Sequence, residues 1–252
     1  MPIVDTHAHL CDPVFDADRE RVLERARRAG VERVVAVGET AADARRNLEL
    51  AEAHPGVVLP AAGLFPTRLE LDEAARLEEL IRAAAGRWTA IGEVGLDHWK
   101  VREEGEREVQ REIFRRFVDL ALELDLPLNV HSRSAGAATL EVLLERGARR
   151  VQMHAFDGRA ARALPGVEAG YYFSVPPSVL RSPQKQKLVR RLPLDRLLVE
   201  TDSPVLGPVP GERNEPAHAV RSLEAIADLK GLSRAEVEET VAESTRRLYR
   251  LA

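Results

Sequence analysis

The stretch Ile3-Val4-Asp5-Thr6-His7-Ala8-His9 joins a short apolar lead to two histidines that lie two positions apart. Such a run is typical of a first β-strand, along which side chains alternate between two faces. His7 and His9 therefore share one face with Asp5. Two imidazoles on one face at the end of a strand favour a metal site, while surface or core histidines remain the alternative for this pair alone.

The composition favours a globular enzyme. The chain has 252 residues, of which 44% are hydrophobic and 31% charged, and one α/β barrel needs about 250 residues. No apolar run of about 18 residues and no secretion leader is present, and the single cysteine, Cys11, fits a reducing cytoplasm, so we expect a cytoplasmic protein without membrane attachment. The net charge of −4 argues against a protein that coats duplex DNA.

Eight β-rich apolar runs alternate with stretches of helical period. The candidate strands are Ile3–His7, Arg33–Val37, Val57–Leu64, Thr89–Leu96, Leu128–His131, Arg150–His154, Gly170–Val175 and Arg196–Thr201. Eight β-then-α units predict an α/β fold, a (β/α)8 TIM barrel that forms a single domain over residues 1–252. A doubly wound sheet is the alternative, but the Gly-rich phosphate loop expected after its early strands does not occur.

Several helices and one loop can be placed between and after these strands. Helices are predicted over Asp16–Ala29, which ends before Gly30, and around residues 109–124, where apolar residues recur at steps of three and four. Residues 202–215 are rich in proline and glycine and predict a loop. Helices over 216–229 and 233–248 follow, the second opened by a capping box of Ser233 and Glu236.

Polar residues gather where the predicted strands end, which is where a barrel of this kind carries its active site. The candidates are His7, His9, Glu93, His131, His154 and Asp202. Each could be a buried or capping residue by itself, but six such groups in one barrel mouth need compensating charge. We therefore predict two divalent ions, with Glu93 as the candidate bridge; Zn²⁺, Mn²⁺, Fe²⁺ and Co²⁺ suit these ligands, and Mg²⁺ suits them less well.

With these residues assembled, the chain resembles the TatD family of metal-dependent hydrolases over nearly its full length. The resemblance rests on Asp-Thr-His-Ala-His-Leu (5–10), Ile-Gly-Glu-Val-Gly-Leu-Asp (91–97), Asn-Val-His-Ser-Arg (129–133), His154 with Phe156 and Gly158, Glu-Thr-Asp-Ser-Pro (200–204) and Arg-Asn-Glu-Pro (213–216). It implies a two-metal phosphodiesterase that trims single-stranded DNA ends, typically as a 3′–5′ exonuclease, or RNA in some members. It also implies one ion on His7, His9, Asp202 and Glu93 and a second on Glu93, His131 and His154.

The hypothesis for the reaction is attack of a metal-bound hydroxide on phosphorus. Asp202 is the candidate proton acceptor, and Arg133, two residues after His131, is the candidate for neutralising the phosphoryl oxygens; its alternative is a salt bridge to Glu93 or Asp97. Asp97 and His98 follow the fourth strand and are candidates for lining the mouth of the site. Asp5 is expected either to orient an imidazole or to cap the end of its strand.

Two other functions stay open at this point. The same ligands could serve an amidohydrolase or esterase that cleaves a C–N or C–O bond, for example an aminoacyl ester on tRNA. The barrel could also be a metal-binding subunit without activity, although a scaffold has no need for an open two-metal centre. We infer no obligate protein partner; the expected substrate is nucleic acid.

Overall fold

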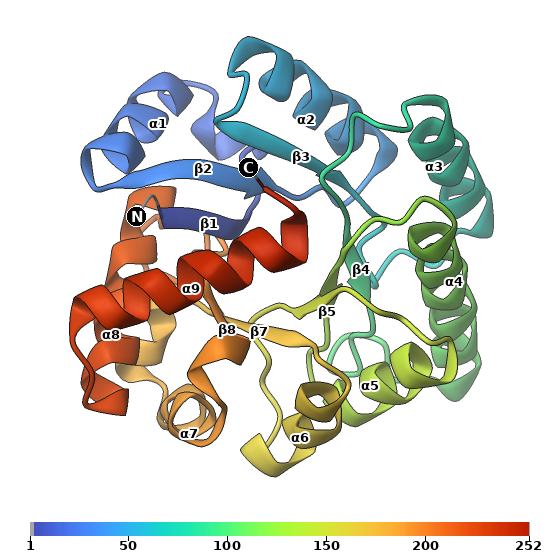
Figure 1. The fold of residues 1–252 in the computed structure, drawn as a ribbon. Coiled ribbons are helices and arrows are strands. Elements are labelled where there is room, and N and C mark those ends of the chain that lie inside the picture. Colours follow the sequence, from blue (N-terminus) through green and yellow to red (C-terminus); the bar gives the residue numbers. More distant parts are fainter. Residues whose placement is uncertain (1–2, 252) are drawn as a thin grey trace.

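Eight parallel strands form the centre of the protein, and the predicted (β/α)8 barrel is confirmed. The computed structural model describes residues 3–251. The strands follow one another in sequence order: β1 (Ile3–Ala8), β2 (Val31–Ala36), β3 (Val58–Ala62), β4 (Ala90–Gly95), β5 (Leu128–His131), β6 (Val151–Met153), β7 (Tyr172–Val175) and β8 (Leu197–Val199). Figure 1 shows this ring of strands with helices around it.

The helices form an outer layer and cover one end of the barrel. The outer layer consists of α1 (Arg19–Arg28), α2 (Ala41–Ala53), α3 (Leu71–Ala83), α4 (Glu104–Glu123), α5 (Gly136–Glu145), α6 (Ala160–Glu168), α7 (Pro183–Arg191) and α8 (Ala219–Lys230). In Figure 1 the last helix, α9 (Arg234–Tyr249), lies across the end of the ring, and it packs against β1 and β8. Among residues 3–251, no helix combines the length and the apolar character that a membrane crossing needs.

Within residues 3–251, four short 3-10 helices lie between these elements, and two of them account for differences from the predicted helix bounds. They are η1 (Pro13–Phe15), η2 (Pro177–Arg181), η3 (Leu194–Arg196) and η4 (Pro216–His218). The helix predicted from Asp16 begins at Arg19, after η1, in which the Asp12 carboxylate accepts a hydrogen bond from the Val14 amide at 2.8 Å. The helix predicted from Pro216 begins at Ala219, after η4. The capping box of Ser233 and Glu236 is present.

The barrel closes between β1 and the segment that follows β8. The Asp202 amide donates to the His7 carbonyl at 2.8 Å, and the His9 amide donates to the Ser203 carbonyl at 2.8 Å. An isolated parallel bridge joins Ala8 to Ser203. Residues about 195 positions apart in the chain are thus adjacent, so that the carboxylate of Asp202 lies beside the two histidines of β1.

Two glycines let β4 and β5 approach closely enough to place their polar side chains together. Gly95 pairs with His131, and a Cβ at Gly95 would lie 2.0 Å from the His131 carbonyl oxygen. A Cβ at Gly92 would lie 2.6 Å from the Cβ of Asn129. Glu93 lies between these glycines and is buried.

That residues 1–252 form one domain stays a prediction, since residues 1, 2 and 252 lie outside the described part.

Candidate metal centre

The six predicted ligands converge at the carboxyl ends of the strands. The Nε2 atoms of His7 and His9 lie 3.4 Å apart, and each lies 3.4 Å from Oδ1 of Asp202. Oε2 of Glu93 lies 3.4 Å from His9 Nε2 and 3.7 Å from His7 Nε2. Donor atoms that are each about 2.1 Å from one tetrahedral ion lie about 3.4 Å from one another. The spacing of these four side chains therefore fits a divalent cation.

A second group of side chains adjoins the first through Glu93. His131 Nδ1 lies 2.6 Å from Oε1 of Glu93, and His154 Nε2 lies 3.6 Å from the same oxygen. Glu93, His131 and His154 form one of three overlapping groups whose ligand atoms lie within 4.8 Å of one another; the others are His7 with His9 and Glu93, and His7 with His154 and Asp202. Glu93 lies between the two groups, which is the position of a bridging carboxylate.

The Glu93 carboxylate supplies an independent test of whether these residues fit a metal. Its Oε2 atom is buried and accepts no hydrogen bond from residues 3–251. An orphaned carboxylate oxygen in the interior is costly, and a cation between it and the imidazoles removes that cost. The donor set of imidazoles and carboxylates without thiolates suits borderline divalent ions. The residues present therefore fit a divalent metal centre.

Hydrogen bonds from the barrel interior fix the orientation of two of the imidazoles. His7 Nδ1 donates to Oδ1 of Asn129 at 2.8 Å, and His154 Nδ1 donates to Oε2 of Glu200 at 3.0 Å. In both residues the Nε2 atom is left facing the cluster. Such partners set the tautomer of a ligand histidine and raise its basicity. Sequence reasoning assigned no role to Asn129 or Glu200, although Asn129 shares the inward face of β5 with His131.

Carboxylates flank both ring nitrogens of His131. Nδ1 faces Glu93, and Nε2 lies 3.2 Å from Oδ2 of Asp97. Burial alone would lower the pKa of His131, but the hydrogen bonds and charges of Asp97 and Glu93 raise it to about 9. Asp97 thereby fixes the ring so that Nδ1 points toward Glu93.

The two acids of the cluster are held ionised by their neighbours. Burial would raise the pKa of Glu93, but the hydrogen bond and charge of His131 lower it well below its usual range. At Asp202 burial is likewise opposed, here first by the charge of His154 and then by the neighbouring imidazoles of His7 and His9, so that its pKa also lies well below the usual range. Two anions thus persist in a buried site, where a cation would be attracted strongly.

Asp5, Asp97 and His98 lie outside the three groups of candidate ligand atoms. The Asp5 carboxylate accepts hydrogen bonds from the Thr201 amide at 2.8 Å and from the His7 amide at 3.3 Å, so it ties β1 to the segment that follows β8. Asp97 is 1% exposed and bonds His131 and the amides of Trp99 and Lys100. Neither Asp97 nor His98 belongs to the cavity wall. Direct substrate contact by these two residues stays a prediction that this placement does not favour.

A cavity of about 420 Å³ opens above the cluster. Its wall includes His9, Glu93, His131, His154 and Asp202 together with Glu39, Phe65, Ser132, Arg133, Ala155, Asp157, Lys185, Val205 and Leu206. Arg133 is exposed, and its guanidinium lies 3.8 Å from the centre of the Trp99 ring. The alternative salt bridge from Arg133 to Glu93 or Asp97 is absent from the described residues. The cavity thus presents a cation at its rim above an anionic floor.

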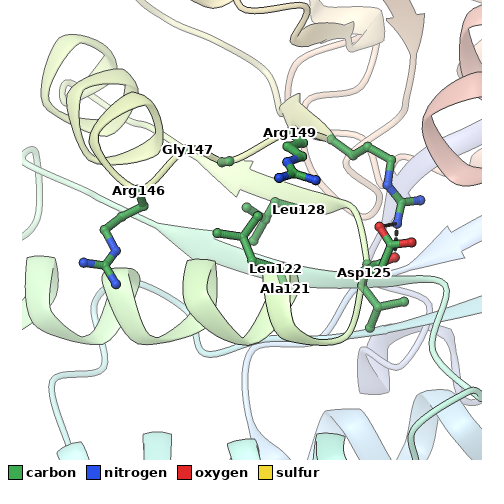
Figure 2. A pocket seen from close by; sticks show the side chains of 10 residues that line it. Ala121, Leu122, Asp125, Leu128, Arg146, Gly147 and Arg149 are labelled. Carbon is green, nitrogen blue, oxygen red and sulfur yellow. Dashed lines mark hydrogen bonds and ion pairs between the residues drawn. The ribbon is translucent and has the colours of Figure 1, made fainter.

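A second hollow lies at the opposite end of the barrel, beside the start of β5. Figure 2 shows Arg149 beside Leu122 of α4 and Leu128 of β5, with Arg146 and Gly147 on the segment that follows α5. Two of its arginines already have partners: Arg146 pairs with Asp119, and Arg150 pairs with Asp125 at 2.9 Å. The hollow also lies at the face of a barrel that usually serves stability. It therefore does not compete with the cavity above the histidines as the functional site.

A barrel that gathers four imidazoles and two carboxylates at the carboxyl ends of its strands has the architecture of the metal-dependent hydrolases. A family model described as TatD related DNase matches residues 4–250. The chain belongs to this family.

Similar proteins support the assignment over the full length of the chain. The putative deoxyribonuclease TATDN3 of Mus musculus is 47% identical over 261 residues, which cover 99% of this chain and 88% of that protein. The deoxyribonuclease TATDN3 of Homo sapiens is 45% identical, with 98% and 94% covered. The crystal structure of YJJV, a TatD homologue from Escherichia coli k12, superposes with a TM-score of 0.91 at 27% identity, with 99% of this chain and 98% of that chain covered.

Proposed function

We propose that this protein is a two-metal phosphodiesterase that trims single-stranded DNA ends, or RNA ends, in the cytoplasm. The observation that carries the proposal is the joined pair of ligand groups around Glu93, beneath a cavity with cations in its wall. The names of the similar deoxyribonucleases support nucleic acid as the substrate. We infer a 3′–5′ direction from the family resemblance.

The ligand assignment follows the two groups. His7, His9, Asp202 and Glu93 would hold one ion, and Glu93, His131 and His154 would hold the other, with zinc, manganese, iron, cobalt or magnesium as the candidates. Bound divalent ions supply Lewis acidity, which acidifies water and offsets charge on phosphoryl oxygens. Asn129, Glu200 and Asp97 keep the imidazoles aligned for this task through the hydrogen bonds described above.

Asp202 is the proton acceptor for the attacking water in this proposal. Its carboxylate is 9% exposed at the cavity floor, and its lowered pKa keeps it ionised at neutral pH. In the reaction, a water oxygen forms a bond to phosphorus, the bond from phosphorus to the leaving ester oxygen breaks, and the water proton passes to Asp202. The leaving oxygen takes up a proton from solvent, and Asp202 returns its proton to solvent.

Arg133 and Trp99 provide a surface for the nucleotide at the rim. Arg133 lies within the cavity wall and can pair with a phosphoryl oxygen as charge builds on it. Trp99 is 45% exposed, and stacking against Arg133 holds its ring in place. An exposed aromatic ring can stack a base of any sequence, which suits an enzyme that trims ends without a sequence motif.

The test is hydrolysis of end-labelled single-stranded DNA and RNA in the presence of Mg²⁺, Mn²⁺ or Zn²⁺. We expect product from the labelled end to accumulate, EDTA to abolish it, and His131→Ala to lose at least about a hundred-fold in rate, while the melting temperature of its metal-free form stays close to that of the metal-free wild type. An active, fully metal-loaded His131→Ala variant would refute the scheme. Cleavage of ester or amide substrates alone would instead select the C–N or C–O hydrolase.

A further inference from the structure

Lys185 lies in the cavity wall and has no part in the proposed metal binding or hydrolysis. It belongs to the first turns of α7, and only four of the 37 basic residues in the chain are lysines. Lys230 binds the carbonyls of Arg190 and Leu192 at the end of α7, and Lys100 lies over the Trp99 ring. Lys187 is exposed on α7. Among these four, Lys185 alone lines the cavity above the histidine and carboxylate cluster.

The ammonium of Lys185 has fewer partners than it can bind. Nζ donates to the Ala155 carbonyl at 2.9 Å, and within residues 3–251 no carboxylate forms an ion pair with it. A lysine ammonium carries three N–H donors, so two are left for a ligand. The group is half-buried, and Glu200, Asp157 and Asp202 attract its charge without forming a direct ion pair, so the two remaining N–H donors are open to an anionic ligand.

The position of Lys185 is fixed by the same loop that carries His154. The Ala155 amide donates to Glu200 at 2.9 Å, while its carbonyl accepts from Lys185, so this peptide is held from both sides. Gln184 Nε2 donates to the Gly158 carbonyl at 2.6 Å and thereby ties α7 to the loop. The lysine is therefore preorganised beside the cluster, which reduces the entropy lost when a ligand binds.

Arg133 and Lys185 lie on connected segments of the cavity wall. Arg133 precedes Ser134, whose amide donates to the Asp157 carboxylate at 3.0 Å, and Asp157 lies on the loop that Lys185 and Gln184 bind. Arg133 on the loop after β5 and Lys185 on α7, which binds the loop after β6, are both in the cavity wall, whereas Phe65, Val205 and Leu206 make other parts of the wall apolar. Single-stranded nucleic acid has anionic phosphates along one side and bases along the other. The phosphates suit the cationic part of the wall, and the bases suit its apolar part.

We propose that Lys185 binds a non-bridging phosphate oxygen of the substrate and selects phosphodiesters over uncharged esters. This inference rests on the proposed function, because it identifies a specificity-determining contact of the same site. Charge-assisted hydrogen bonds from an ammonium to a phosphate are strong when solvent is excluded, and the bond would be lost with a neutral substrate.

The experiment compares Lys185→Met and Lys185→Arg with Lys187→Met, a matched control on the exposed face of the same helix. Inorganic phosphate binding to the metal-loaded proteins is measured by calorimetry, and KM and kcat are measured with a single-stranded oligothymidylate. We expect Lys185→Met to weaken phosphate binding and to raise KM by about ten-fold or more, with the metal content unchanged. Lys185→Arg should restore part of both, and Lys187→Met should match the wild type.

The outcomes separate the two proposals. A Lys185→Met protein that binds phosphate as tightly as Lys187→Met overturns the role of Lys185, whether or not the enzyme cleaves DNA. A wild type that binds phosphate through Lys185 but cleaves no phosphodiester overturns the proposed function and leaves the lysine contact standing. If Lys185→Met is unfolded by circular dichroism, Lys185→Gln takes its place, and unchanged phosphate binding in that variant rejects the contact.

Discussion

Glu200 is a buried residue that orients His154, one of the candidate metal ligands. Its carboxylate is fully buried and accepts hydrogen bonds from His154 Nδ1 at 3.0 Å, Ser174 Oγ at 2.6 Å and the Ala155 amide at 2.9 Å. Glu200→Gln keeps the shape but removes the charge that orients His154. We expect a loss of about 10- to 100-fold in metal affinity, measured by competition with a chelator. Glu212→Gln, the same change at an exposed position, should bind metal like the wild type.

Trp99 permits a test of the nucleobase contact that is separate from the chemistry. Because stacking on an aromatic ring is worth about 1–3 kcal/mol per base, Trp99→Ala should weaken oligonucleotide binding by about five-fold or more. Hydrolysis of bis(p-nitrophenyl) phosphate, which carries no base, should change little. Trp99→Phe should retain most of the binding, as measured by fluorescence anisotropy. Equal losses on both substrates would show that Trp99 acts on the cluster instead of on the base.

At the scale of single residues, the sequence points to the candidate ligands that the fold brings together, but not to the residues that orient them. His7, His9, His131 and His154 stand out because imidazoles are rare and lie at strand ends. Glu200 contacts His154 across 46 positions of the chain, so no local spacing points to it. Lys185 is one of 37 lysines and arginines in the sequence, and only the fold shows that it lines the cavity.

Strand β4 requires glycine at position 95, which pairs with His131 of β5. Gly95 has φ 145°, and an added Cβ would lie 2.0 Å from the His131 carbonyl oxygen. Gly95→Ala must therefore push β4 and β5 apart, and we expect a loss of about 2 kcal/mol or more in the free energy of unfolding, together with weaker metal binding.

The control for this change is Gly105→Ala, in which the added Cβ has open space within α4. Alanine favours helix over glycine by about 1 kcal/mol, so this variant should be as stable as the wild type or more stable. Thermal denaturation of both variants measures the difference. A Gly95→Ala protein with the melting temperature and metal affinity of the wild type would contradict the close approach of the two strands.

The loop after β8 is anchored to α1 by an ion pair whose pH dependence can be predicted. Arg213 donates to both Asp18 oxygens, at 2.8 and 2.7 Å, and this hydrogen bonding lowers the pKa of Asp18 to about 2. A carboxylate with a depressed pKa stabilises the fold above its ordinary pKa near 3.8, and the contribution disappears as the pH falls through 2.

Replacing Arg213 should therefore lower the melting temperature by a small amount at pH 6, since the pair is largely exposed, and by less at pH 2. Differential scanning calorimetry of the wild type and Arg213→Gln at both pH values measures this change. A difference in melting temperature that grows on acidification would contradict the assignment. The sequence motif at residues 213–216 gave no indication of this anchoring, because Asp18 lies 195 positions away.

For the molecule as a whole, the spacing of apolar residues predicts the barrel, because each strand and each helix has its own characteristic spacing within a short stretch of sequence. All eight strands lie where the apolar runs predict them, with bounds that differ by a few residues. The closure between β1 and β8 is different, because it depends on hydrogen bonds such as that from Asp202 to His7, which no local pattern encodes. Hydrophobic periodicity therefore predicts the architecture, and contacts between distant segments determine how the side chains of the site are aligned.

Metal binding should be visible in the stability of the entire barrel, since the cluster joins strands β1, β4 and β5 to the segments after β6 and β8. A ligand that binds the folded state alone stabilises it by about 2.7 kcal/mol at a hundred times its dissociation constant, which raises the melting temperature by about 5–10 °C for a chain of this size. EDTA treatment should lower the melting temperature by this amount, and Zn²⁺ or Mn²⁺ should restore it. His131→Ala should respond less, because one ligand group is incomplete. Identical melting curves with and without EDTA, in protein whose metal content has been measured before and after, would exclude a metal centre that links these strands.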